Sequence, residues 1–124
     1  MSKFVQIKTE IHDLAMVKQS LNDLEIRYQE NAVYNHRYSD FRGQVPILIS
    51  QGRTQFGLRE RDDGAYEVIG DDMEMVPINR TMKKVQQRYA YHKVKAETEK
   101  AGFMLVEENV GNDDVIRMTV RRWS

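Results

Sequence analysis

The segment 86–94, QQRYAYHKV, concentrates side chains that could do chemistry. Arg88, Tyr89, Tyr91 and His92 lie within five positions of a stretch with helical periodicity. A histidine can transfer protons or bind a metal ion, whereas a tyrosine beside an arginine is typical of a protein-binding hot spot. The segment therefore raises three hypotheses: an enzyme centred on His92, a metal site and a partner-binding surface.

A helical wheel divides these residues between two faces. At about 100° per residue, one stripe of the helix carries Met82, Val85, Tyr89, His92 and Ala96. Tyr89 is therefore predicted to pack its ring in the core and to need a partner for its hydroxyl, and His92 to be a hydrogen-bonded structural residue. Arg88 and Tyr91 fall on the opposite, solvated side. They are either a binding hot spot or a surface pair in which the tyrosine covers its neighbours' side chains.

Other arrangements for catalysis or metal binding are weak. The chain has no cysteine, no G-x-S-x-G elbow and no glycine-rich nucleotide motif. His12 and His36 are far from His92 in sequence, and the acidic cluster Asp71, Asp72 and Glu74 lacks a calcium-loop spacing. We therefore predict no catalytic residues, no metal site and no cofactor, and keep an enzyme centred on His92 as one alternative.

The segment 34–42, YNHRYSDFR, interleaves aromatic and basic side chains. This composition suits base stacking and phosphate contacts, and the candidate contacts to RNA or single-stranded nucleic acid are Tyr34, Arg37, Tyr38 and Arg42. Against this hypothesis, 19 Lys and Arg balance 19 Asp and Glu, so the formal net charge is zero. The alternative is a loop that folds its aromatic rings onto the edge of a sheet.

The elements that must position these residues follow from periodicity and turn signals. Alternation over residues 4–11 predicts a strand, and Asp13 predicts the N-cap of a helix that ends near Leu24. Further strands are predicted over 25–29, 45–50, 55–59, 65–69, 103–107 and 115–123. Residues 30–44 are predicted to form a long loop, Asp63-Gly64 a hairpin turn, and residues 79–101 the second helix.

The order β-α-β-β-β-β-α-β-β is dominated by hairpins. It predicts one α+β domain, residues 1–124, as a two-layer sandwich of a mainly antiparallel sheet with both helices on one face. The other face would be open to a partner or to a second copy in a homodimer. Its predicted side chains are Phe4, Lys8, Arg117, Thr119, Arg121 and Trp123. Trp123 is either a terminal plug on the core or an interface anchor. The candidate partner-binding residues are therefore the pair discussed above, Arg88 and Tyr91, together with Trp123.

The chain carries no export or membrane signal that we can identify. No apolar run approaches the roughly 18 residues of a membrane span, and MSKFVQIKTE lacks the apolar region of a secretory signal. We therefore expect a soluble protein of the cytoplasm or an equivalent compartment.

Several stretches of the chain resemble one family. These are SKFVQIKTEIHDL (2–14), FRGQ (41–44), VQQRYAYHKVKAETEKAGF (85–103) and VIRMTVRRWS (115–124). They resemble the family of the conserved chloroplast reading frame thirty-five, the domain of unknown function numbered twelve-fifty-seven, which occurs in cyanobacteria, red-algal-type plastids and scattered other bacteria. The middle, residues 30–80, departs from this pattern, because acidic GDDMEMVPIN stands where relatives carry aromatic residues.

The family has no established catalytic activity, so the resemblance carries over no catalytic residues. Its distribution suggests a link to photosynthesis, with a location in the cytoplasm of a cyanobacterium, the plastid stroma or, for a phage copy, the host cytoplasm. We therefore expect a non-enzymatic accessory or regulatory protein that acts by binding a protein partner. An RNA- or single-strand-binding module is the alternative, and an enzyme centred on His92 is the second.

Overall fold

The computed structural model describes residues 3–36, 39–110 and 115–122, and only the backbone of residues 105–107, 109 and 110. The elements are β1 (Phe4–Lys8), α1 (Leu14–Asp23), β2 (Arg27–Asn35), β3 (Arg42–Gln51), β4 (Thr54–Glu60), β5 (Tyr66–Asp71), the 3₁₀ turn η1 (Asp72–Glu74), α2 (Met75–Lys100), β6 (Phe103–Val110) and β7 (Ile116–Arg122). The predicted α+β class and the predicted order of helices and strands are confirmed.

The main sheet has five antiparallel strands in the order β1-β5-β4-β3-β2. Short turns join β3 to β4 and β4 to β5, and the second contains the predicted Asp63-Gly64 turn. In the second turn Gly64 has φ of 86°, and the backbone N–H of Ala65 donates to an Asp63 carboxylate oxygen at 3.0 Å. The Asp63-Gly64 pair therefore shapes this hairpin as predicted.

The connection between β2 and β3 is shorter than predicted. Residues 30–35 continue β2 rather than beginning a loop, and they pair with β3 as far as Asn35 opposite Arg42. The strand pattern was hidden by a local irregularity: Asn31 has φ of 51° and lies opposite Pro46, which has no N–H to donate. This break in an edge strand interrupts the alternation that sequence reasoning relies on.

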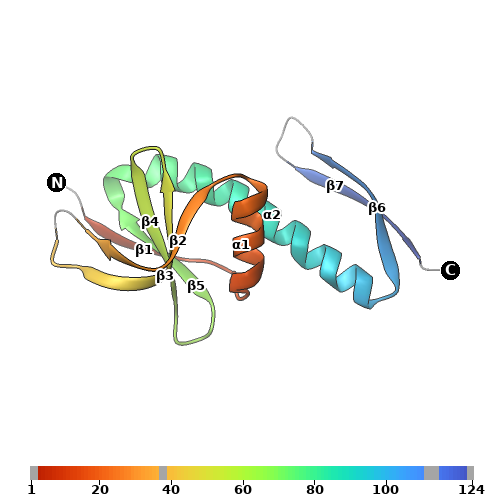
Figure 1. Ribbon diagram of the computed structural model, residues 1–124, viewed down its shortest axis with the longest axis horizontal. Coiled ribbons are helices and arrows are strands. Elements are labelled where there is room, and N and C mark those ends of the chain that lie inside the picture. Colours follow the sequence, from red (N-terminus) through yellow and green to blue (C-terminus); the bar gives the residue numbers. More distant parts are fainter. Residues whose placement is uncertain (1–2, 37–38, 111–114, 123–124) are drawn as a thin grey trace.

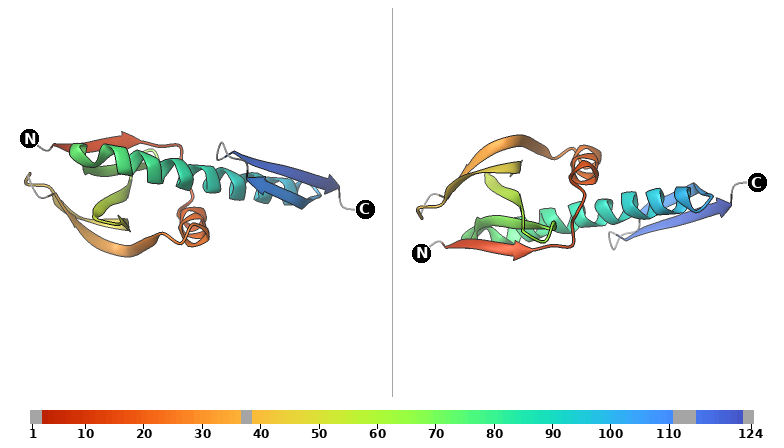
Figure 2. Two further views of the ribbon diagram at one scale, coloured as in Figure 1. Left: turned by 90° about the horizontal axis from the view of Figure 1, so that it is seen from above. Right: turned by 90° about the horizontal axis from the view of Figure 1, so that it is seen from below.

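Apolar side chains cover both faces of the main sheet. On one face α1 and α2 pack over Phe56, Leu58, Ile47 and Ile49, which are fully buried. On the other face the β2–β3 hairpin curls over the sheet until Phe41 stacks on Phe4 of β1, with ring centroids 4.3 Å apart. Figure 2 shows β2 and β3 turning back toward β1. The open face that we predicted around Phe4 is therefore closed by the chain itself.

The second helix is longer than the sheet that it covers. It begins at Met75, ahead of the predicted start at Asn79, because Pro77 is tolerated in a first turn. Its 26 residues span about 39 Å. Figure 1 shows its outer half running beyond the sheet, where β6 and β7 form a separate two-stranded sheet.

This separate sheet differs from the single sheet that we expected. Gly102, with φ of 88°, ends α2 only after the helix has left the main sheet, so the last hairpin pairs with itself. We call residues 88–110 and 115–122 the arm, and residues 3–36 and 39–87 the body. Arg117, Thr119 and Arg121 thus lie on the arm, away from Phe4 and Lys8 on β1 of the body.

Candidate functional site

Four charged or polar side chains join the arm to the body. The Arg88 guanidinium bonds to Asp23 of α1 at 2.9 Å and to Glu108 of β6 at 2.6 Å. The Nε2 atom of His92 lies 2.6 Å from the same Asp23 oxygen. We call Asp23, Arg88, His92 and Glu108 the polar junction, because they connect α1, α2 and β6.

Electrostatics favour the charged state of the carboxylates in this junction. Burial opposes ionisation of Asp23, but hydrogen bonds from Arg88 and His92 outweigh it and lower its pKa. Burial likewise opposes ionisation of Glu108, and hydrogen bonds with Tyr91 and Arg88 lower its pKa. These groups pair with one another, so the junction holds α1, α2 and β6 together.

Two of the partner-binding candidates lie inside this arrangement rather than on an open surface. Tyr91 is only 7% exposed, although the wheel placed it on the solvated side. The hairpin of β6 and β7 covers that side of α2. The helical wheel assumed that α2 packs against one sheet only, so it could not predict burial by a second sheet. The Arg88 guanidinium stacks over the Tyr91 ring at 4.2 Å, and Trp123 lies outside the described residues.

The two core-facing candidates make the contacts that a structural interpretation requires. The hydroxyl of Tyr89 accepts hydrogen bonds from the backbone N–H groups of His12 and Asp13, at 3.1 and 3.2 Å. His92 bonds to Asp23 rather than to another histidine. Among the described residues no group of three or more His, Cys, Asp or Glu side chains could hold a metal ion.

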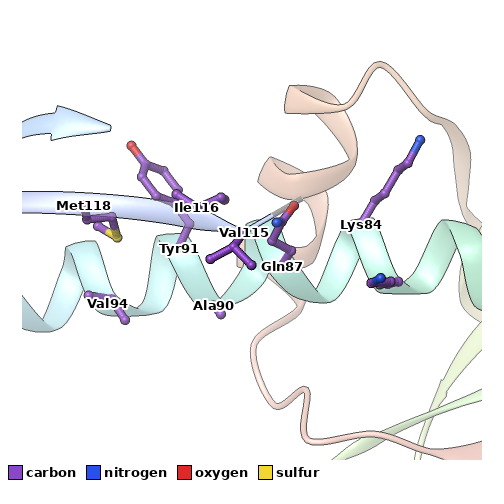
Figure 3. A pocket seen from close by; sticks show the side chains of 9 residues that line it. Lys84, Gln87, Ala90, Tyr91, Val94, Val115, Ile116 and Met118 are labelled. Carbon is purple, nitrogen blue, oxygen red and sulfur yellow. The ribbon is translucent and has the colours of Figure 1, made fainter. Parts of the chain in front are cut away.

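An apolar groove lies beside the polar junction, between α2 and β7. It has a volume of about 380 Å³ and is lined by Lys83, Lys84, Gln87, Ala90, Tyr91, Val94, Val115, Ile116 and Met118. Val94 and Val115 are 43% and 46% exposed, which is high for aliphatic side chains. Figure 3 shows Tyr91 of α2 beside Ile116 of β7, with Ala90 and Val94 further around the helix and Lys84 at the end nearer the body. Sequence reasoning missed this groove, since it depends on where the last hairpin packs.

The aromatic-basic segment 34–42 folds most of its described rings inward. Tyr34 is buried, and Phe41 packs between Phe4 and the guanidinium of Arg59, 5.3 Å from its ring centroid. Burial, with the nearby carboxylates of Asp71 and Glu74, raises the pKa of Tyr34 to about 12. Arg42 is exposed at the start of β3, and Arg37 and Tyr38 lie outside the described residues. The arrangement matches the alternative of aromatic rings folded onto the sheet.

Residues 34–36 of this segment also line a polar pocket of about 780 Å³ that sequence reasoning missed. His36, only 2% exposed, lines it; its Nδ1 is 2.6 Å from the Ser39 hydroxyl and its Nε2 is 3.4 Å from Asp71. Asp71 also accepts the backbone N–H of Met73 at 2.9 Å. The only feature of the sequence that could have indicated this pocket was a histidine, His36, among aromatic residues.

The chain matches one family over most of its length. The model of the family described as protein of unknown function DUF1257 matches residues 20–119. The chain belongs to the DUF1257 family. This confirms the resemblance seen in the sequence blocks, and the family match includes the polar junction and all residues of the apolar groove.

Curated relatives of this DUF1257 protein carry the name "Uncharacterized protein ycf35". The protein from Pyropia yezoensis is 29% identical over 127 residues, covering 100% of this chain and 99% of the relative. The protein from Guillardia theta is 30% identical over 126 residues, covering 99% and 98%, and that from Cyanophora paradoxa is 28% identical over 127 residues. No solved structure matches the chain. None of the helices in the described residues is long and apolar enough to cross a membrane.

Proposed function

We propose that this DUF1257 protein is a non-enzymatic accessory or regulatory protein that acts by binding a partner protein at the groove between α2 and β7. The observation that carries the proposal is the exposure of Val94 and Val115 in one concave apolar surface. An exposed apolar groove with polar residues at its rim is one of the forms that interaction sites take. The polar junction beside it supports the proposal, because the bond from Arg88 to Glu108 holds β6 against α2 and so keeps the groove in shape.

The biological setting belongs to the same proposal. The resemblance to proteins of cyanobacteria and plastids, together with relatives from three photosynthetic lineages, favours a partner linked to photosynthesis or its regulation. We place the protein in the cytoplasm of a cyanobacterium or in the plastid stroma. This inference rests on lineage rather than chemistry.

A site-specific photocrosslinker tests the groove directly. A crosslinking amino acid replaces Val115 in the groove or Val33 on β2, two valines of nearly equal exposure at 46% and 48%. The tagged protein is expressed in the native host, irradiated and purified with and without nuclease, and its crosslinks are identified by mass spectrometry. We expect one reproducible protein partner from position 115 that is absent from position 33.

The outcomes separate the candidate functions. Equal crosslinks from both positions, or none from position 115, would contradict a partner site in the groove. A crosslink to a second copy would identify a homodimer. Recovery that collapses after nuclease treatment would favour the nucleic-acid alternative, with Arg42 and the exposed Arg117, Arg121 and Arg122 of β7 as contacts. Removing Trp123 in the same assay tests its proposed role as an interface anchor.

A further inference from the structure

The groove between α2 and β7 has an electrostatic character that narrows the choice of partner. We propose that its occupant is an amphipathic helix of a partner protein, with an apolar stripe and a cluster of carboxylates toward one end. This inference rests on the proposed function, and it names the chemistry of the partner at the same site.

The floor of the groove selects an apolar stripe. Ala90, Tyr91, Val94, Val115, Ile116 and Met118 provide it. Two of these side chains, Val94 and Val115, remain more than 40% exposed, so covering them removes aliphatic surface from water. A polar ligand would have to give up its own contacts with water to cover these aliphatic side chains, and they offer it no hydrogen bonds in return.

The body end of the groove selects negative charge. Lys83 and Lys84 line it, both exposed, and no carboxylate belongs to the lining residues. The wider charge distribution has the same sign. The chain from the start of α2 at residue 75 onward carries ten Lys and Arg against six Asp and Glu, and the preceding residues carry nine against thirteen. The part of a neutral chain that supplies the groove thus carries a net positive charge, which would attract an acidic partner.

The shape of the groove favours a helix over an added strand. Its lining on α2 runs from Lys83 to Val94, about 16 Å along the helix axis. An amphipathic helix places anchors at i, i+3 or i+4 and i+7 over a similar length. The exposed arginines of β7, Arg117 and Arg121, discourage pairing of another strand at this hairpin.

Fluorescence anisotropy with defined peptides tests this inference on the full chain. The probe is a labelled helical peptide of about 16 residues, with leucines at i, i+3 and i+7 and glutamates clustered at one end. The matched control peptide carries lysines in place of the glutamates. We expect the acidic peptide to bind about tenfold tighter or better at low ionic strength, since each tenfold step corresponds to about 1.4 kcal/mol. The difference should shrink as salt is added.

Variants of the protein locate the binding. Lys83→Glu with Lys84→Glu should reverse the preference between the two peptides. Lys3→Glu with Lys8→Glu, a charge-matched change at residues that do not line the groove, should leave it unchanged. Val94→Asp should abolish binding of both peptides, and Val115→Ser provides a second variant should Val94→Asp lower the melting temperature. Equal affinity for both peptides, or binding unaffected by the groove variants, would overturn the inference.

Crosslinking of the natural partner to the groove variants distinguishes failure of this inference from failure of the proposed function. If the protein crosslinked from position 115 is lost on Val94→Asp but retained after the double lysine reversal, the groove binds a partner and the acidic-helix inference fails. If an RNA oligonucleotide displaces the acidic peptide and binds with the same lysine dependence, nucleic acid is the occupant and the inference also fails. Loss of the partner in both variants supports the acidic helix.

Discussion

In the body, apolar side chains from both helices and from the main sheet enclose one another, and Phe56, Leu21 and Val85 are fully buried. In the arm, a two-stranded sheet packs on the outer half of one helix, and its connection to α1 is made by the polar junction. The body is thus stabilised mainly by burial of apolar surface. The arm depends on a few directional contacts and leaves Val94 and Val115 exposed together in one groove.

The difference supports the proposal that the arm carries the partner-binding site. An isolated two-stranded hairpin is at best marginally stable in water, so the arm gains little from its own packing. Its position is nevertheless fixed by Arg88, which contacts α1 and β6 at once. A region that is held in place but incompletely covered is suited to receiving a partner.

Phe56→Ala should have the largest effect, and it should act on the body. Phe56 is fully buried beneath both helices, so truncation removes a large apolar side chain and leaves a cavity. We expect the free energy of unfolding to fall by about 3–5 kcal/mol, measured by urea denaturation with far-ultraviolet circular dichroism. Phe103→Ala, in the half-exposed start of β6, is the matched control and should cost less than half as much. Equal losses would show that the arm is packed as tightly as the body.

Local signals in the sequence were sufficient for much of the body. Asp13 caps α1 by accepting the backbone N–H of Met16 at 3.2 Å, as its type and position indicated. The Asp63-Gly64 turn depends on a glycine at positive φ. Tyr89 faces inward because helical periodicity places it on the apolar stripe. Each of these features is determined within a few residues of chain.

The arm and the candidate site could not be predicted in the same way. Whether Tyr91 is buried depends on the position of β6 and β7, which is set by how far α2 runs before Gly102 ends it. The groove likewise combines side chains of α2 with Val115, about twenty residues further along the chain. A helical wheel assumes that one side of a helix is buried along its whole length. In α2 the buried side differs between the half that packs on the main sheet and the half that packs on β6 and β7.

Arg88→Ala should have an intermediate effect that is confined to the arm. The change removes the hydrogen bonds that connect Asp23 and Glu108 through one guanidinium. We expect a loss of about 1–2 kcal/mol and faster hydrogen exchange in β6 and β7, with little change in β3 and β4. Arg80→Ala, an exposed arginine on the same helix, should alter stability by no more than about 0.5 kcal/mol. Uniformly faster exchange throughout the chain would contradict a separate role for the junction.

Acidification should produce the smallest effect, again at the arm. The folded-state pKa of Asp23 is lowered from 3.8, because hydrogen bonds from Arg88 and His92 outweigh the opposing effect of burial. A carboxyl with a lowered folded pKa stabilises the protein at pH values above its unfolded pKa, and this contribution is lost as pH falls through the folded value. The stabilisation should therefore be complete at neutral pH and decline below about pH 4. Because Asp23 is partly exposed, we expect less than about 1 kcal/mol.

Comparing wild type with Asp23→Asn isolates this contribution. Urea denaturation of both proteins at neutral pH and at pH 3 should show a smaller acid-induced loss in the variant, since an amide does not titrate. Asp62→Asn, an exposed aspartate on the β4–β5 turn of the body, controls for removal of one carboxylate. Hydrogen exchange should assign the difference to β6 and β7. If the acid-induced loss is unchanged in Asp23→Asn, or if it falls equally on β3 and β4, then the charge on Asp23 does not distinguish the arm from the body.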